Sequence, residues 1–174
     1  MKWPTWSIGV LILVSLRAQT PNDYSASASD SAYNVKPPVA QVDLRIARRA
    51  MEILNSPAKW NRGDSRVCRI KQCKSGCPTS KSGCPTKAQV FSLYCALEKA
   101  TNELTGSFEH RGTAMQEARF VVDEVATNRS DFQHRLQGYN NDPATTFADI
   151  QRVLQLVESR IGKQLDDAGR LSQH

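Results

Sequence analysis

The sequence predicts an all-α domain, a compact bundle of four main helices plus one short helix, with a Cys-rich loop between the first two. Three observations lead to this prediction. Apolar residues recur every three or four positions in several segments of helical length. Residues that start and stop helices flank these segments. No convincing run of alternating apolar and polar residues indicates a β-strand.

The first main helix is expected to begin near residue 41 and to end near Asn55-Ser56-Pro57, because proline cannot continue a helix. Its apolar side repeats at helical spacing, with arginines and acidic residues on the opposite side. The residues of this apolar side are Val42, Ile46, Ala50 and Ile53, joined by Leu44, Ala47, Met51 and Leu54.

The second main helix is predicted between Thr86 and Gly106, with start and stop signals at both ends. Thr86-x-x-Gln89 has the spacing of a capping box, in which two side chains satisfy the free amides of the first turn. Gly106 suits the left-handed residue that ends many helices. Apolar residues repeat between them: Val90, Leu93, Tyr94, Leu97, Ala100 and Leu104.

Three further helices complete the bundle. A main helix is predicted over Thr113 to Thr127, a short helix over Phe132 to Leu136 that stops at Gly138, and a last main helix over Phe147 to Ile161. The third main helix would bury Met115, Ala118, Val121, Val122 and Val125. The last would bury Phe147, Ile150, Leu154, Val157 and Ile161.

The segment just before the last helix forms a motif of polar and turn-forming residues: Tyr139, Asn140, Asn141, Pro143, Thr145 and Thr146. Thr146-x-x-Asp149 has capping-box spacing, so the favoured interpretation is a helix entry with Tyr139 packed as an anchor. The alternative is a site of chemistry in which the amides of Asn140 and Asn141 point into a cleft.

Two of these motifs resemble those of an uncharacterised family of small bacterial helical domains of unknown function. Residues 92–100 are similar to its Cys-x-x-Gly-Ala-Leu-x-x-Ala helix, and the closing motif is similar to Trp-Asn-Asp-x-Pro-x-Thr, with Tyr139 in place of Trp. Trp60 and Gly63 match a Trp and a Gly that follow the family's first helix. The resemblance spans about Val42 to Ile161 and implies a helical fold, but it implies no reaction.

The N-terminus has the pattern of an export signal. An apolar run from Ile8 to Leu16 follows Lys2, and small residues allow cleavage after Ala18. We therefore expect a signal peptide at 1–18, a disordered spacer at 19–40, a helical domain at 41–163 with its Cys-rich loop at 61–87, and a tail at 164–174. The chain would be periplasmic or secreted, with no membrane span after signal removal. A buried N-terminal strand or an uncleaved anchor is the alternative.

The five cysteines lie between residues 68 and 95. In an exported chain they predict disulfides that pin the loop to the helices. The disulfide candidates are Cys68, Cys73, Cys77 and Cys84. Cys95 is the candidate free thiol, because it falls in the middle of a predicted helix, where Cys packs as a small apolar residue. Zinc is a minor alternative, since no pair has Cys-x-x-Cys spacing and no His lies nearby; no metal site or cofactor is predicted.

Positive charge is concentrated in residues 36–87, which hold twelve Lys/Arg against three Asp/Glu, a net charge of +9. This charge favours an anionic surface or protein as partner. Nucleic acid is disfavoured, because only Trp60 lies among the basic residues to stack on bases. A solvated face without a specific partner is the alternative. The candidate basic patch comprises Arg45, Arg48, Arg49, Arg62, Arg66, Arg69 and Lys71.

No set of catalytic residues is assigned. The leading hypothesis is an exported, non-enzymatic helical protein that contacts an anionic envelope or extracellular partner through its basic first helix and loop. The alternative is a thiol-active or hydrolytic enzyme that uses Cys95, Asp131 and His134, because Asp131 and His134 are three residues apart and would share a helix face.

Overall fold

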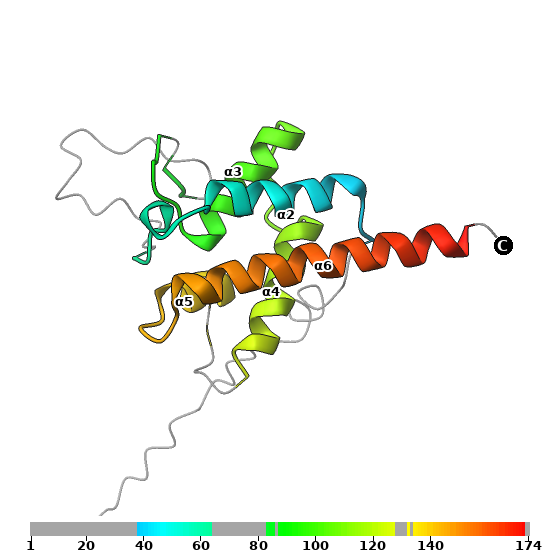
Figure 1. The fold of residues 1–174 in the computed structure, drawn as a ribbon. Coiled ribbons are helices and arrows are strands. Elements are labelled where there is room, and N and C mark those ends of the chain that lie inside the picture. The colour runs from blue at the N-terminus through cyan, green and yellow to red at the C-terminus, as the bar shows by residue number, and fades with distance from the viewer. Residues whose placement is uncertain (1–37, 64–82, 86, 128–131, 133, 173–174) are drawn as a thin grey trace, which may run out of the picture. The chain divides into compact units, whose positions relative to one another are not determined.

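The computed structural model describes residues 38–63, 83–85, 87–127, 132 and 134–172. The predicted signal peptide and most of the predicted spacer lie outside these ranges. The described elements are α2 (Gln41–Ile53), the 3-10 helix η1 (Pro57–Lys59), α3 (Leu93–Thr105), α4 (Thr113–Val125), α5 (Arg135–Asn141) and α6 (Phe147–Leu171) (Figure 1). The predicted all-α class is confirmed, and the described ranges contain no helix long and apolar enough to cross a membrane.

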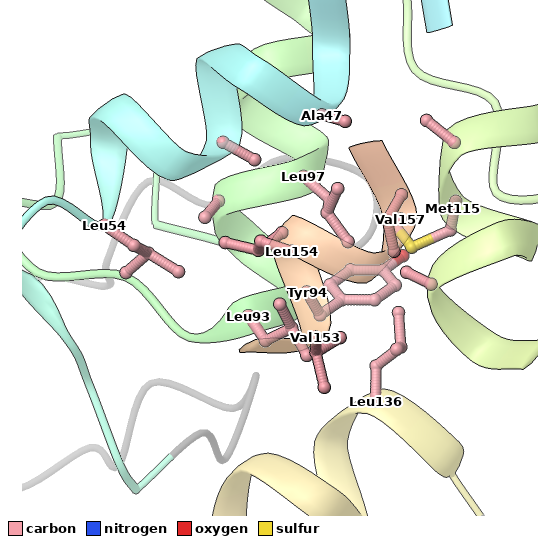
Figure 2. Packing of buried hydrophobic residues seen from close by; sticks show 14 of the residues in the cluster. Ala47, Leu54, Leu93, Tyr94, Leu97, Met115, Leu136, Val153, Leu154 and Val157 are labelled. Atoms are coloured by element: carbon pink, nitrogen blue, oxygen red, sulfur yellow. The ribbon is translucent and has the colours of Figure 1, made fainter. Parts of the chain in front are cut away.

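The helices pack around one core. Helix α2 lies beside α6 and also contacts α3, whereas α4 contacts α6 from another side (Figure 1). The short helix α5 packs on α3 and α4. Tyr94 of α3 is only 1% exposed, and Figure 2 shows its ring among Met115, Leu136 and Val157, which come from three other helices. One aromatic side chain of α3 therefore contributes to the packing of α4, α5 and α6.

The apolar faces predicted for α2, α4 and α6 supply about half of the buried core. Ile46 and Ala50 of α2, Val121 of α4, and Leu154 and Ile161 of α6 are all buried. Burial of each large aliphatic side chain stabilises the fold by about 1.5 to 3 kcal/mol. The spacing of apolar residues therefore located these three helices correctly.

Two predicted helix ends also agree with the structure. Gly106 follows α3 with a φ of 75°, a left-handed conformation that glycine adopts without strain. At the start of α6, the Thr146 hydroxyl accepts a hydrogen bond from the backbone N–H of Asp149 at 3.2 Å. The Asp149 carboxylate in turn accepts one from the N–H of Thr146 at 2.8 Å. These two bonds form the predicted capping box.

A buried carboxylate joins the starts of α2 and α4. Asp43 accepts a hydrogen bond from the N–H of Ala40 at 2.8 Å, and the N–H of Ala114 in the first turn of α4 bonds to it as well. Burial raises the pKa of Asp43 above its ordinary value, although both backbone hydrogen bonds favour the charged form. The residue was predicted only as part of the polar side of its helix.

The start predicted for α3 is wrong by several residues, because the helix begins at Leu93 and not near Thr86. Ser92 is the cap, and its side chain accepts a hydrogen bond from the N–H of Cys95 at 3.2 Å. Phe91 is held in an extended conformation by pairing with residues beside Trp60. Val90, expected on the buried side, therefore lies outside the helix and is 44% exposed.

The predictions for α5 and for the end of α6 also differ from the structure. Helix α5 spans Arg135–Asn141, so Gly138 lies inside it and does not end it. Glycine is needed at this helical position because the Phe132 ring lies close to the backbone: a Cβ atom at Gly138 would lie only 2.7 Å from Cδ1 of Phe132. Helix α6 continues to Leu171, through most of the predicted tail at 164–174.

This packing predicts opposite effects for two glycine substitutions. Gly138→Ala should lower the free energy of unfolding by about 1 to 3 kcal/mol, because the new methyl group would overlap the Phe132 ring. Gly162→Ala, at a helical site with no atom within 4 Å of the added Cβ, should raise it by about 0.5 to 1 kcal/mol. Urea unfolding of both variants measures the two changes, and a stabilising Gly138→Ala would contradict the contact.

Candidate functional site

The most connected polar side chain of the described structure is Asn140, which has no exposed surface. Its Oδ1 accepts hydrogen bonds from Trp60 Nε1 at 2.8 Å and from the N–H of Leu93 at 3.0 Å. Its Nδ2 donates to the carbonyl oxygens of Asn61 at 2.9 Å and Arg62 at 3.2 Å. Only a primary amide offers both an acceptor and two donors at one side-chain end, so Asn and Gln alone could make this set.

These bonds hold together the two ends of the segment 62–90. Trp60 and Phe91 form a parallel bridge. In this bridge, the N–H of Asn61 donates to the Phe91 carbonyl, and the N–H of Phe91 donates to the Lys59 carbonyl, both at 2.8 Å. The Cys-rich segment is therefore a closed loop whose two ends meet at one place. We use the name loop base for Trp60, Phe91, Asn140 and the disulfide between Cys84 and Cys95, which is described below.

Aromatic and cationic contacts extend the loop base to α6. The ring centroids of Trp60 and Phe147 are 6.2 Å apart. The Arg62 guanidinium lies over the Trp60 ring, 5.9 Å from its centroid, and donates a hydrogen bond to the Pro143 carbonyl. Arg62 was predicted as part of a basic patch, but it is used here to join the loop base to the turn before α6.

The disulfide joins Cys84 to Cys95, and both residues are at least 95% buried. The prediction of a disulfide at Cys84 is correct, but the prediction of a free thiol at Cys95 is wrong. The free-thiol prediction failed because α3 starts later than expected. Cys95 therefore lies in the first turn of the helix and not in its middle. Cys68, Cys73 and Cys77 lie outside the described residues.

The closing motif has the two structural roles that the sequence favoured, a helix cap and a buried anchor, and a third structural role that neither interpretation included. Thr146 caps α6 and Tyr139 is a buried anchor, 2% exposed, with its ring edge-to-face with Phe132. Asn140, by contrast, takes no part in the cap: it lies in α5 and binds the loop base. Asn141 is exposed, and its Oδ1 accepts a bond from Asn140 Nδ2 at 3.1 Å.

The described part of the basic patch is mostly engaged within the protein. Arg48 pairs with Glu158 of α6 at 2.7 Å. Arg49 pairs with Glu52 and with Glu103 of α3, both at 2.7 Å. Arg45 is exposed, and Arg66, Arg69 and Lys71 lie outside the described residues. The first helix therefore uses two of its arginines to bind neighbouring helices.

The residues of the enzyme hypothesis do not form a described catalytic site. Cys95 is oxidised in the disulfide, and Asp131 lies outside the described ranges. His134 is an exposed residue at the start of α5. The described residues include no group of three His, Cys, Asp or Glu side chains that could hold a metal ion.

Sequence reasoning missed two polar features near α3. His110 lies between Tyr94 Oη, 3.0 Å from its Nδ1, and Arg119, 3.2 Å from its Nε2. Because a guanidinium only donates, the Nε2 atom is the acceptor in the contact with Arg119. Glu98 is 3% exposed and lines a cavity beside the disulfide. Neither role has a sequence signal, because each depends on side chains brought together from different elements.

Comparison with known proteins identifies the family of this chain. The model of a family of unknown function (DUF6197) matches residues 39–160, more than half of the 174 residues, so the chain belongs to this family. No curated protein and no solved structure matches the chain. The family's function is unknown, so the loop base and the residues around it are the features of this chain that bear on its function.

Asn140→Asp tests the loop base with an almost isosteric change. The new carboxylate would place an oxygen where Nδ2 now donates to the Asn61 and Arg62 carbonyls, so we expect a loss of about 3 kcal/mol or more in the free energy of unfolding at pH 7. Burial among acceptors would raise its pKa in the folded state. The loss should therefore shrink as pH falls from 7 toward 5, because protonation restores one donor.

Asn141→Asp is the matched control for this variant. It introduces the same charge one residue away, at an exposed position that keeps its accepting oxygen, and should change stability by less than about 0.5 kcal/mol. Equal effects of the two variants in urea unfolding at pH 7 would show that Asn140 does not have the role described here.

Removing the disulfide should loosen the loop base. Replacement of both Cys84 and Cys95 by Ser should lower the free energy of unfolding of the oxidised protein by about 2 to 3 kcal/mol, because the bond closes a short ring in the unfolded chain. Denaturant unfolding measures the change, and peptide mapping without reduction checks the pairing. A Cys84 peptide joined to a cysteine other than Cys95 would contradict the assignment.

Proposed function

We propose that this member of a family of unknown function is an exported, non-enzymatic binding protein. In this proposal, the closed loop 62–90 is its contact element, and its partner is an anionic surface or protein of the cell envelope or exterior. The helical bundle is the scaffold that holds the two ends of the loop together.

The distribution of charge is the observation that carries the proposal. Residues 62–90 contain seven of the 23 Lys/Arg and one of the 17 Asp/Glu, so 16 residues of each sign remain elsewhere. The loop's net charge is therefore +6, the same as that of the whole chain, and removal of Lys2 and Arg17 with the signal peptide would leave the rest of the mature chain with a net charge of −2. A local excess of one sign attracts partners of the opposite sign over long range.

The loop base supports this role because it fixes where the charge is presented. Backbone pairing at Trp60 and Phe91 and the Asn140 amide join the two ends of the loop, and the disulfide ties Cys84 inside the loop to Cys95 of α3. Binding residues are often carried by loops that a rigid scaffold positions. Fixing both ends lowers the conformational entropy that the loop must lose when a partner binds.

The arginines of α2 contribute less to the proposed surface than composition suggested. Arg48 and Arg49 are paired with carboxylates of α6, α2 and α3. An anionic partner would have to compete with these carboxylates for the same guanidinium groups. We therefore assign the contact to the loop and not to the first helix.

Export and the absence of a reaction are supported by separate features. Disulfides persist in oxidising compartments outside the cytosol, and the Cys84–Cys95 bond fits such a location together with the signal pattern at 1–18. The enzyme alternative required a reactive thiol at Cys95, and this sulfur is bonded to Cys84. The intact mass of protein secreted by the producing host would test cleavage after Ala18 directly.

Retention on a heparin column tests the charged contact. The oxidised protein should bind at low salt and elute as salt rises, because screening weakens contacts between exposed charges. Replacing Lys71, Lys74 and Lys81 by Gln removes three of the loop's charges and should lower the eluting salt concentration by about half or more.

A triple variant of the bundle with the same net charge serves as the control. Arg45, Arg152 and Lys163 are exposed on α2 and α6, and replacing them by Gln should change the elution only slightly. Equal shifts for the two triple variants would show that only net charge matters. Either that result or passage of the unmodified protein through the column at low salt would overturn the proposal.

A further inference from the structure

The disulfide uses a cysteine from a segment that the chain carries twice. Residues 74–80 read Lys-Ser-Gly-Cys-Pro-Thr-Ser, and residues 81–87 read Lys-Ser-Gly-Cys-Pro-Thr-Lys. Cys77 of the first copy is therefore equivalent to Cys84 of the second. The two copies differ only at their last position, where Lys87 of the second copy is exposed. The residues next to the two cysteines are thus identical.

The described residues of the second copy show how it fits beside α3. Gly83 has a φ of 90°, in the left-handed region that favours glycine. Cys84 is 5% exposed and is bonded to Cys95. Pro85 lines a cavity of about 270 Å³ together with Phe91 and the two cysteines. We use the name disulfide socket for the place beside Cys95 and Phe91 that Gly83, Cys84 and Pro85 occupy.

The first copy offers the same three residues, Gly-Cys-Pro, at 76–78. These residues lie outside the described ranges. Gly76 can adopt the left-handed conformation that the socket uses, because it has no Cβ atom. Cys77 carries the thiol that the bond to Cys95 needs. Local sequence therefore does not distinguish the two copies as occupants of the socket, and only their connections to the rest of the chain differ.

These connections are long enough for either copy. Cys95 lies four residues after Phe91, which pairs with Trp60, so the socket is near both ends of the loop. With the first copy in the socket, residues 64–75 would lead in and residues 79–90 would lead out. At about 3.3 Å per residue, each of these stretches reaches up to about 40 Å. Each doubling of the length of a loop lowers the probability of closing it only about threefold.

The chain also holds a thiol that can make the exchange. It contains five cysteines. With Cys84 and Cys95 paired, Cys68, Cys73 and Cys77 remain, and three cysteines of one chain cannot all pair with one another. A thiolate exchanges with a disulfide through attack of one sulfur on another, with no net change in oxidation state. The exchange therefore needs no external oxidant or reductant.

From these observations we infer that residues 76–78 are a second occupant of the disulfide socket, in which Cys77 replaces Cys84 as the partner of Cys95. The Cys77 thiolate attacks Sγ of Cys95. A bond forms between these two sulfurs as the bond from Cys95 to Cys84 breaks, and Cys84 leaves as a thiolate. The proton that Cys77 gives to water is matched by the one that Cys84 takes up. Burial of the bond in the folded state keeps the exchange slow.

The two pairings divide the loop differently. With Cys84 bonded, residues 62–83 lie between the loop base and the disulfide. With Cys77 bonded, only residues 62–76 do, and Lys81 moves to the other side of the bond. The inference goes beyond the proposed function and holds whether or not the loop binds an anionic partner.

Peptide mapping of Cys84→Ser tests the inference. Trypsin leaves each of the five cysteines in a different peptide, with Cys77 in residues 75–81 and Cys95 in residues 88–99. The oxidised variant is treated with iodoacetamide, which blocks further exchange, and is digested without reduction. Most of the Cys95 peptide should be joined to the Cys77 peptide, and the intact protein should have the mass of a monomer.

The matched control is Cys77→Ser, which removes the equivalent cysteine of the first copy and should keep the bond between Cys84 and Cys95. In Cys84→Ser, a free thiol at Cys95 would overturn the inference, because the first copy would then not enter the socket. A bond from Cys95 to Cys68 or Cys73 would also overturn it, because pairing would then not depend on the repeated sequence.

A measurement on the unmodified protein keeps the test decisive if Cys84→Ser does not fold. The protein is equilibrated with reduced and oxidised glutathione, alkylated and mapped in the same way. The Cys77–Cys95 peptide should be at least about one twentieth as abundant as the Cys84–Cys95 peptide, because the connections change in length by only about a factor of two. A lower ratio would contradict the inference. Neither measurement depends on heparin binding, so the two proposals can fail independently.

Discussion

The amide of Asn140 is the interaction on which the rest of this structure depends. It joins the residues after η1, the first residue of α3 and the helix that precedes α6, with no water-exposed surface of its own. A buried polar group is costly unless its bonding capacity is satisfied. Because the amide needs all three segments at once, it selects one arrangement of them. The positions of the Trp60–Phe91 bridge and of the disulfide follow from that arrangement.

What the sequence predicted well is what short stretches of chain determine by themselves. The periodicity of α2, α4 and α6, the glycine that ends α3 and the capping box at Thr146 are all local, and the structure agrees with them. What it missed is non-local. Ser92 became the cap of α3 because Phe91 and Leu93 bond to residues far away in sequence, and this same shift brought Cys95 into reach of Cys84.

Charge shows a similar division between composition and structure. Counting residues correctly found an excess of positive charge before α3, but it could not show that Arg48 and Arg49 bind carboxylates of neighbouring helices. Exposed pairs of this kind add little stability, about 0 to 1 kcal/mol each. Their effect here is to occupy the guanidinium groups of α2, so that these groups are less available to a partner. The excess positive charge of the chain then lies in the loop 62–90. Burial of Glu98 was missed for a similar reason, because it depends on how other elements pack around α3.

The closed loop base also bears on how this protein can change over time. The seven residues from Lys74 are nearly repeated by the seven that begin at Lys81, the mark of a tandem duplication. In a loop whose ends are already held together, even doubling the length adds only about 0.6 kcal/mol of closure entropy. A further copy can therefore be added without moving a helix, provided that one cysteine still pairs with Cys95. The first copy carries one lysine and the second carries two, and each carries one cysteine. The length and charge of the loop can therefore change in units of seven residues while the bundle stays the same.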